Sequence, residues 1–225
     1  MKRTIILSIA LLCWLFGQAQ SETTRERPFF HDEFRLGTVF FSEGNTVRAM
    51  LNYNFVSQEM QFLNHLENDA ILDLVRQPNL THVEIGDDVF VPVGRGFAHI
   101  IRGGPVMLLK RKHIDIVAGR GRGAYGSSTN TAAVRTPPYL IGGIGGATAA
   151  NFTNLPLETE YRVRLHFYLM KNGSIYSATR RNFLRVYREV RPQLEAFMRD
   201  NTIDFSNERH LLGLTNFANS LLLTN

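Results

Sequence analysis

The sequence has almost no cysteine. Its one cysteine, Cys13, lies within the first twenty residues, in an apolar run that continues beyond it. A lipoprotein cysteine is not indicated, because Leu12 precedes Cys13 where lipoprotein processing requires a small residue. If these twenty residues are removed, the mature chain has no thiol. Disulfides, thiolate metal sites and cysteine nucleophiles are then excluded.

Long hydrophobic runs are also lacking. The longest, Ile5 to Phe16, holds twelve residues, whereas a membrane-spanning helix needs about 20. Lys2 and Arg3 precede this run, and small and polar residues follow it at positions 17–20. This order is typical of a signal peptide over residues 1–20. The sequence therefore predicts an exported protein, periplasmic or secreted, without a transmembrane helix after cleavage.

The charge is close to balanced. The chain has 25 Lys and Arg and 20 Asp and Glu, and residues 1–20 hold two of the cations and none of the acids. The remaining 205 residues thus carry 23 cations against 20 acids, a net charge of +3. So small an excess does not indicate nucleic-acid binding.

Familiar catalytic motifs are missing as well. There is no Gly-x-Ser-x-Gly elbow and no Ser-x-x-Lys, which argues against the common serine hydrolases. The glycine run at 142–146 lacks the flanking strand and helix that a dinucleotide site requires, so no cofactor is expected. Because sequence alone cannot pair distant carboxylates and histidines, the chain leans towards a non-enzyme.

Short segments with period-two patterns follow between Phe34 and Val117. Turn residues separate three predicted hairpins at 42–45, 86–88 and 103–104. A glycine-rich stretch from 118 to 157 has little periodicity and reads as a long loop. Residues 161–170 then alternate as a strand, and Asn172-Gly173 predicts a type I′ turn.

The C-terminal part has helical spacing. Phe183, Tyr187, Val190 and Leu194 recur on one face, and Pro192 predicts either a kink or the start of a second helix. Ser206 is placed to cap a last helix over 207–222. The sequence thus predicts an α+β fold: an antiparallel β meander, as a small barrel or sandwich-like sheet, followed by two to three helices. The expected organisation is a signal peptide (1–20), a flexible segment (21–33) and a single domain (34–225) whose helical part spans about 179–223.

Several segments occur together in a familiar order. They are Gly37-Thr38-Val39, Leu51-Asn52-Tyr53-Asn54, Glu59-Met60-Gln61-Phe62, residues 119–126 ending Gly-Ala-Tyr-Gly, and Lys171-Asn172-Gly173 with the helix that follows. As a set, they resemble a family of uncharacterised exported proteins of Bacteroidota over most of residues 32–222. The resemblance implies secretion and a β-rich body with a helical tail. It implies no activity.

The first candidate site combines the start of the long loop with a residue just before it. Lys112, Arg120, Arg122 and Tyr125 lie close together in the sequence, among glycines whose backbone N–H groups suit an anion. The sequence favours an anionic ligand here as one interpretation and a solvated loop as the other. The Gly-Lys-Ser/Thr ending of a phosphate-binding loop is absent.

Two further clusters are weaker candidates. His82 and Glu84 share a strand face, but two polar residues there do not require a metal, and no metal is expected. An arginine row at 181, 185 and 188 follows helical spacing. It is interpreted either as a solvated helix face or as a surface that docks on acidic lipid headgroups or a partner.

Three functions remain open. The leading hypothesis is a non-enzymatic envelope or secreted module that binds another envelope or surface protein. The second is a periplasmic binder of small anionic ligands through residues 119–150. The third is a hydrolase of glycans or peptides that assembles its acids from distant segments. The oligomeric state is left open.

Overall fold

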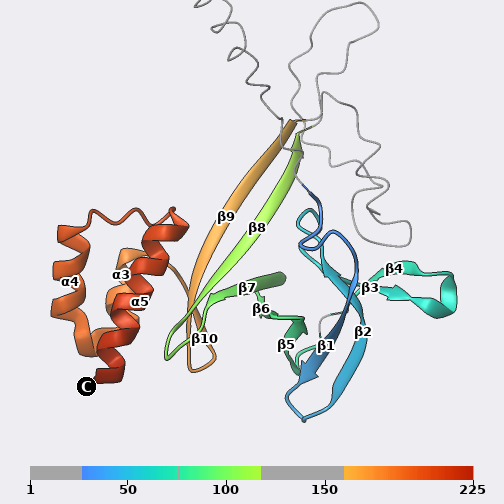
Figure 1. The fold of residues 1–225 in the computed structure, drawn as a ribbon, viewed down its shortest axis with the longest axis horizontal. Helices are drawn as coiled ribbons and strands as arrows, with labels where there is room; N and C mark the ends of the chain where they lie inside the picture. The colour runs from blue at the N-terminus through green and yellow to red at the C-terminus, as the bar shows by residue number, and fades with distance from the viewer. Residues whose placement is uncertain (1–26, 76, 118–159, 225) are drawn as a thin grey trace, which may run out of the picture.

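The architecture is α+β, as predicted. The computed structural model describes residues 27–75, 77–117 and 160–224. Ten strands form one antiparallel sheet, and helices follow at the C-terminal end. Figure 1 shows the helices beside one end of the sheet.

The first four strands form a meander. They are β1 (Arg35–Phe41), β2 (Thr46–Tyr53), β3 (Met60–Asn64) and β4 (Ala70–Asp73), with a short 3₁₀ turn, η1 (His65–Glu67), before β4. The predicted hairpin at 42–45 is confirmed, because β1 and β2 pair from Arg35↔Leu51 to Phe40↔Thr46. Gly44 takes a φ of 81° in the turn, a conformation that glycine adopts without a steric penalty.

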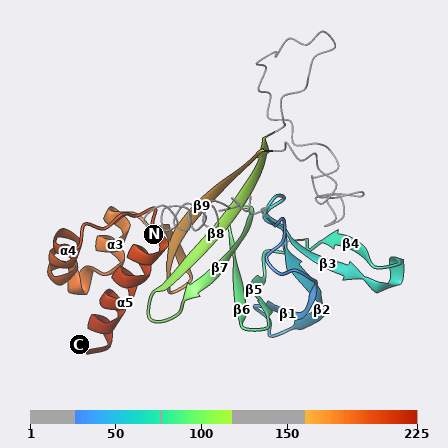
Figure 2. The ribbon, with the colours of Figure 1, turned by 45° about the horizontal axis from the view of Figure 1, so that its top comes forward.

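The second meander runs from β5 to β10. Its strands are β5 (Leu80–Ile85), β6 (Asp88–Val93), β7 (Gly96–Arg102), β8 (Met107–Val117), β9 (Glu160–Lys171) and β10 (Ser174–Ser177). The hairpins predicted at 86–88 and 103–104 are confirmed as β5–β6 and β7–β8. The β8–β9 pair is the longest and projects beyond its neighbours (Figure 2).

A pairing between β1 and β5 joins the two meanders. Val39 lies opposite Val83, and a register shift follows at Phe40/Phe41. The strand order is therefore β10-β9-β8-β7-β6-β5-β1-β2-β3-β4. The sheet is open, because β10 and β4 are its two edges.

The C-terminal helices are α3 (Arg180–Val186), α4 (Arg191–Asp200) and α5 (Glu208–Thr224), with a 3₁₀ turn, η3 (Arg188–Val190), between the first two. Pro192 lies in the first turn of α4, so of the two predicted outcomes a second helix start is the one observed. Proline suits this position because the first N–H groups of a helix have no intrahelical acceptor. The cap of α5 is Asn207 rather than Ser206: its Oδ1 accepts hydrogen bonds from Arg209 N (3.0 Å) and His210 N (3.3 Å).

The apolar core is divided along the sheet. One cluster packs the helices against β8 and β9, and includes Leu108, Leu169, Phe183 and Tyr187, all fully buried. A second cluster fills the curved part of the sheet around Tyr53, Phe90 and Phe97, together with Val39, Leu51, Val83 and Ile85. The two clusters lie on the same sheet face, because opposite residues of paired strands point the same way.

Residues 27–33, part of the segment expected to be flexible, lie against this sheet. Phe29 is buried, and Phe30 N donates a hydrogen bond to Tyr53 O (2.9 Å). The buried Asn52 holds the segment with its side chain: its Oδ1 accepts from His31 N (3.0 Å) and its Nδ2 donates to His31 O (2.9 Å). These bonds satisfy backbone groups that no neighbouring strand pairs.

Candidate functional site

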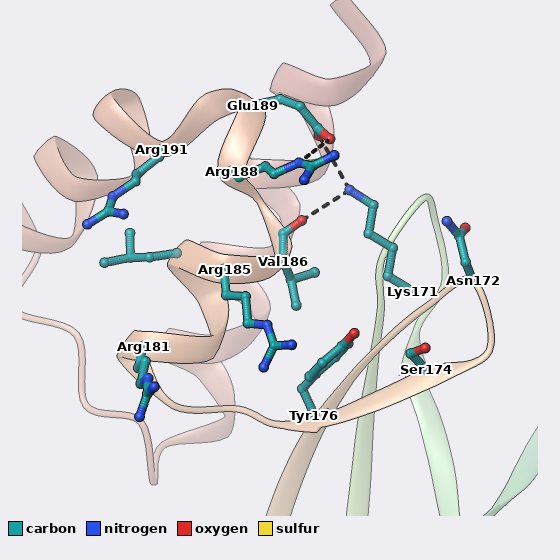
Figure 3. A pocket seen from close by; sticks show the side chains of 11 residues that line it. Lys171, Asn172, Ser174, Tyr176, Arg181, Arg185, Val186, Arg188, Glu189 and Arg191 are labelled. Atoms are coloured by element: carbon teal, nitrogen blue, oxygen red, sulfur yellow. Dashed lines mark hydrogen bonds and ion pairs between the residues drawn. The ribbon is translucent and has the colours of Figure 1, made fainter.

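A pocket lies between the β9–β10 hairpin and the start of the helical layer. Its volume is about 780 Å³. Figure 3 shows the hairpin on one side and α3 with η3 on the other. Side chains from two consecutive parts of the chain, the hairpin at the sheet edge and the helices that follow it, therefore meet across one space.

The hairpin supplies Lys171 and Tyr176. Its turn residues Asn172 and Gly173 have φ values of 50° and 74°, which confirms the predicted tight turn with two left-handed residues. Ser174 pairs with Lys171 and Tyr176 pairs with Leu169, so these four side chains share one face. Because Leu169 is buried under the helices, the same face presents Lys171 and Tyr176 to the pocket.

The helical side supplies a row of arginines. Thr179 caps α3, and its Oγ1 accepts from Asn182 N (3.4 Å). Phe183 and Tyr187 are fully buried. Helical spacing then directs Arg181, Arg185 and Arg188 away from the core and towards the hairpin. Arg191, at the start of α4, extends the row.

The pocket is strongly cationic. Glu189 is the one acidic residue among the described lining residues. Five lining residues are basic: Lys171, Arg181, Arg185, Arg188 and Arg191. Glu189 Oε2 lies 3.4 Å from Lys171 Nζ, and its Oε1 lies 3.8 Å from Arg188 Nε. Arg191 Nε in turn pairs with Glu195 Oε1 at 2.9 Å, outside the lining. The two carboxylates thus offset only part of the positive charge.

Lys171 is held in place by more than this ion pair. Its Nζ also donates a hydrogen bond to Val186 O (3.0 Å), near the end of α3. The carbonyl groups at a helix C-terminus lack intrahelical donors and attract cations. Lys171 therefore ties the hairpin to the helix and fixes the width of the pocket.

Arg181 and Arg185 are differently placed. Neither guanidinium has a hydrogen bond or ion pair within the described part of the chain. Arg185 lies over the ring of Tyr176, with Cζ 5.2 Å from its centroid, which orients the side chain without occupying its N–H donors. A guanidinium with free donors in a fork geometry is suited to bind a phosphate or carboxylate through two hydrogen bonds.

Of the residues predicted for the first candidate site, only Lys112 belongs to the described chain, and it does not line this pocket. Lys112 lies on β8, where its Nζ is 5.0 Å from the centroid of Phe55. Arg120, Arg122 and Tyr125 lie outside the described residues. The arginine row at 181, 185 and 188 does line the pocket, together with Lys171 and Arg191, for which the sequence predicts no binding role. The only local signal for Lys171 is its position before the Asn-Gly turn.

The remaining polar candidates form pairs. His82 Nε2 lies 3.3 Å from Glu84 Oε1, and the His82 ring stacks on Phe40 at 4.3 Å. Three or more His, Cys, Asp or Glu side chains that could hold a metal ion do not meet anywhere in residues 27–75, 77–117 and 160–224. In the same ranges, no helix combines the length and apolar character needed to cross a bilayer.

Comparisons with models of known protein families, with curated proteins and with solved structures find no match to this chain.

Proposed function

We propose that the protein is a non-enzymatic binding module of the cell envelope or of the secreted fraction, and that it binds a partner carrying negatively charged groups in the pocket between β9–β10 and α3. The observation that carries this proposal is the pair of arginines, Arg181 and Arg185, whose guanidinium donors are free in a pocket with four more positive than negative side chains. The signal-peptide pattern of residues 1–20 supports export.

The kind of ligand follows from the chemistry of the site. Guanidinium and ammonium groups bind phosphate or carboxylate, and such charge-assisted bonds are stronger than neutral ones. The side chains of Tyr176, Asn172 and Ser174 add neutral hydrogen-bonding groups to the wall. A ligand with at least two negative groups matches the spread of cations from Lys171 to Arg191.

A binding role is supported over catalysis by the composition of the pocket. Glu189 pairs with Lys171 and Arg188, so its carboxylate is engaged as a counter-ion. Histidine is not among the described lining residues. A hydrolase in this pocket would lack a free carboxylate or imidazole to serve as a general base.

Isothermal titration of the purified protein with inorganic pyrophosphate tests the proposal. We expect the wild type to bind, and Arg181→Ala/Arg185→Ala to weaken binding by about tenfold or more, because each charge-assisted hydrogen bond contributes about 1.5–3 kcal/mol. Arg199→Ala is the matched control, because Arg199 is an exposed arginine on α4 that does not line the pocket. Absence of pyrophosphate binding, or equal affinity in all three proteins, would contradict the proposal.

A further inference from the structure

An apolar groove lies on the sheet face opposite the helices. Its volume is about 520 Å³, and its lining includes Val91, Ile100, Met107, Met170 and Ile175. Met107 and Met170 are a cross-strand pair next to Leu108 and Leu169. Because Leu108 and Leu169 pack under the helices, strand alternation directs the two methionines to the other face.

The β9–β10 hairpin contributes to both the basic pocket and this groove. Lys171 and Tyr176 line the pocket, whereas Met170 and Ile175, one residue earlier on each strand, line the groove. β10 is the edge of the sheet, so no further strand separates the two spaces on that side. One ligand can therefore contact both by passing around the edge of the hairpin.

We propose that the ligand of the basic pocket is an anionic lipid, whose phosphate binds Arg181 and Arg185 and whose acyl chain lies in the groove beside Met170 and Ile175. This inference rests on the proposed function. It accounts for two features that a free anion leaves unexplained: the groove is apolar, and it shares the β9–β10 hairpin with the cationic pocket.

The dimensions agree with this arrangement. A sheet with its side chains is about 10 Å thick, and an extended acyl chain reaches about 15 Å, half of a hydrocarbon core of about 30 Å. A lipid with its phosphate on one face thus has enough chain to enter the groove on the other. The methionines suit such a ligand because their flexible side chains adapt to irregular apolar shapes.

A titration with three soluble probes tests the inference. They are a phosphatidic acid and a phosphatidylcholine that each carry a single twelve-carbon chain, used below their micelle concentrations, and glycerol 3-phosphate, which lacks the chain. The phosphatidylcholine has a chain but no net charge. We expect the phosphatidic acid to bind at least tenfold more tightly than either other probe. The physical reason is that burial of each methylene raises affinity by about fourfold.

Two variants separate the groove from the pocket. Ile175→Asn should weaken phosphatidic acid binding at least tenfold and leave glycerol 3-phosphate and pyrophosphate binding unchanged. Leu66→Asn is the matched control, because Leu66 is 95% exposed and does not line the groove. Met170→Gln repeats the test if circular dichroism shows that Ile175→Asn is misfolded.

The outcomes distinguish the inference from the proposed function. Equal affinity for phosphatidic acid and glycerol 3-phosphate, or an unchanged affinity in both groove variants, would overturn the lipid inference while pyrophosphate binding keeps the proposed function. Tight binding of phosphatidylcholine would overturn it too, because the net negative charge of the headgroup would then contribute nothing. Failure of all anions to bind would overturn both.

Discussion

Asn219 connects the helical layer to the sheet. Its side chain is buried on α5, where Oδ1 accepts hydrogen bonds from Val106 N (3.2 Å) and the Tyr187 hydroxyl (3.0 Å). Its Nδ2 donates to Val106 O (2.9 Å). The Asn219 side chain also leaves room only for glycine at position 104, in the turn before β8, since a Cβ there would come within 2.7 Å of Asn219 Nδ2. One amide thus satisfies three buried polar groups, two on Val106 and one on Tyr187.

Replacing this amide should destabilise the protein strongly. We expect Asn219→Ala to lower the free energy of unfolding by about 2–4 kcal/mol, because three buried polar groups lose their partner. Tyr187→Phe removes only one of these bonds and should cost about 1 kcal/mol. Urea unfolding followed by circular dichroism measures both values. Equal losses in the two variants would show that the bonds to Val106 contribute nothing.

The sequence predicted some of the residues of the basic pocket and missed others. The row of Arg181, Arg185 and Arg188 is visible from helical spacing alone, and docking to an anionic surface was one of its two interpretations. Lys171 is different, because its role depends on the carbonyl of Val186. A side chain whose partner lies fifteen residues away on another element has no local signature.

At the scale of elements, β1 is the strand that holds the two meanders together. It pairs with β2 on one side and with β5 on the other. Gly37 lies where these pairings are tightest: a Cβ there would be 2.5 Å from Glu84 O and 2.9 Å from Leu51 Cδ1. The Glu84 backbone oxygen cannot move without breaking the β1–β5 ladder. Position 37 therefore has no room for a side chain and requires glycine.

Gly37→Ala tests this junction. We expect it to lower the free energy of unfolding by about 1–3 kcal/mol, the usual cost of forcing an extra carbon into a packed core. Gly103→Ala is the matched control, because a Cβ there meets nothing within 4 Å, and it should change stability by less than about 0.5 kcal/mol. Thermal unfolding midpoints compare the two. Similar midpoints would mean that β1 and β5 separate easily to admit the methyl group.

At the scale of the whole molecule, a cluster of His31, Asp88 and His99 links the N-terminal segment to the sheet. Asp88 Oδ1 lies 2.9 Å from His99 Nε2, and its Oδ2 lies 3.5 Å from His31 Nε2. Phe30 contacts both imidazole rings edge-on.

Burial is the main cause that lowers the pKa of His31 and of His99 below the ordinary value. Arg35 and Lys110 act in the same direction, while Asp88, Asp32 and Glu208 oppose them.

The protein should therefore lose stability in mild acid. The unfolded chain binds protons to these histidines at a pKa of about 6.5, whereas the folded protein resists protonation until a lower pH. Their contribution is thus complete above about pH 6.5 and is lost as the pH falls. We expect a lower urea midpoint at pH 5.5 than at pH 7.5, and a smaller difference in His31→Gln/His99→Gln. A midpoint that stays constant or rises in acid would contradict this sign.

Local pattern by itself determined the predicted tight turns, the helices and the strands other than β3 and β4, because alternation, Asn172-Gly173 and Pro192 act over a few residues. It therefore predicted the α+β class and three hairpins before residue 110. Only the tertiary structure decided that β1 pairs with β5, since that contact joins segments far apart in the sequence, such as Val39 and Val83. It also decided the candidate site. Cations from a hairpin and from a helix row become one pocket only when buried Leu169 and Phe183 pack the two elements together.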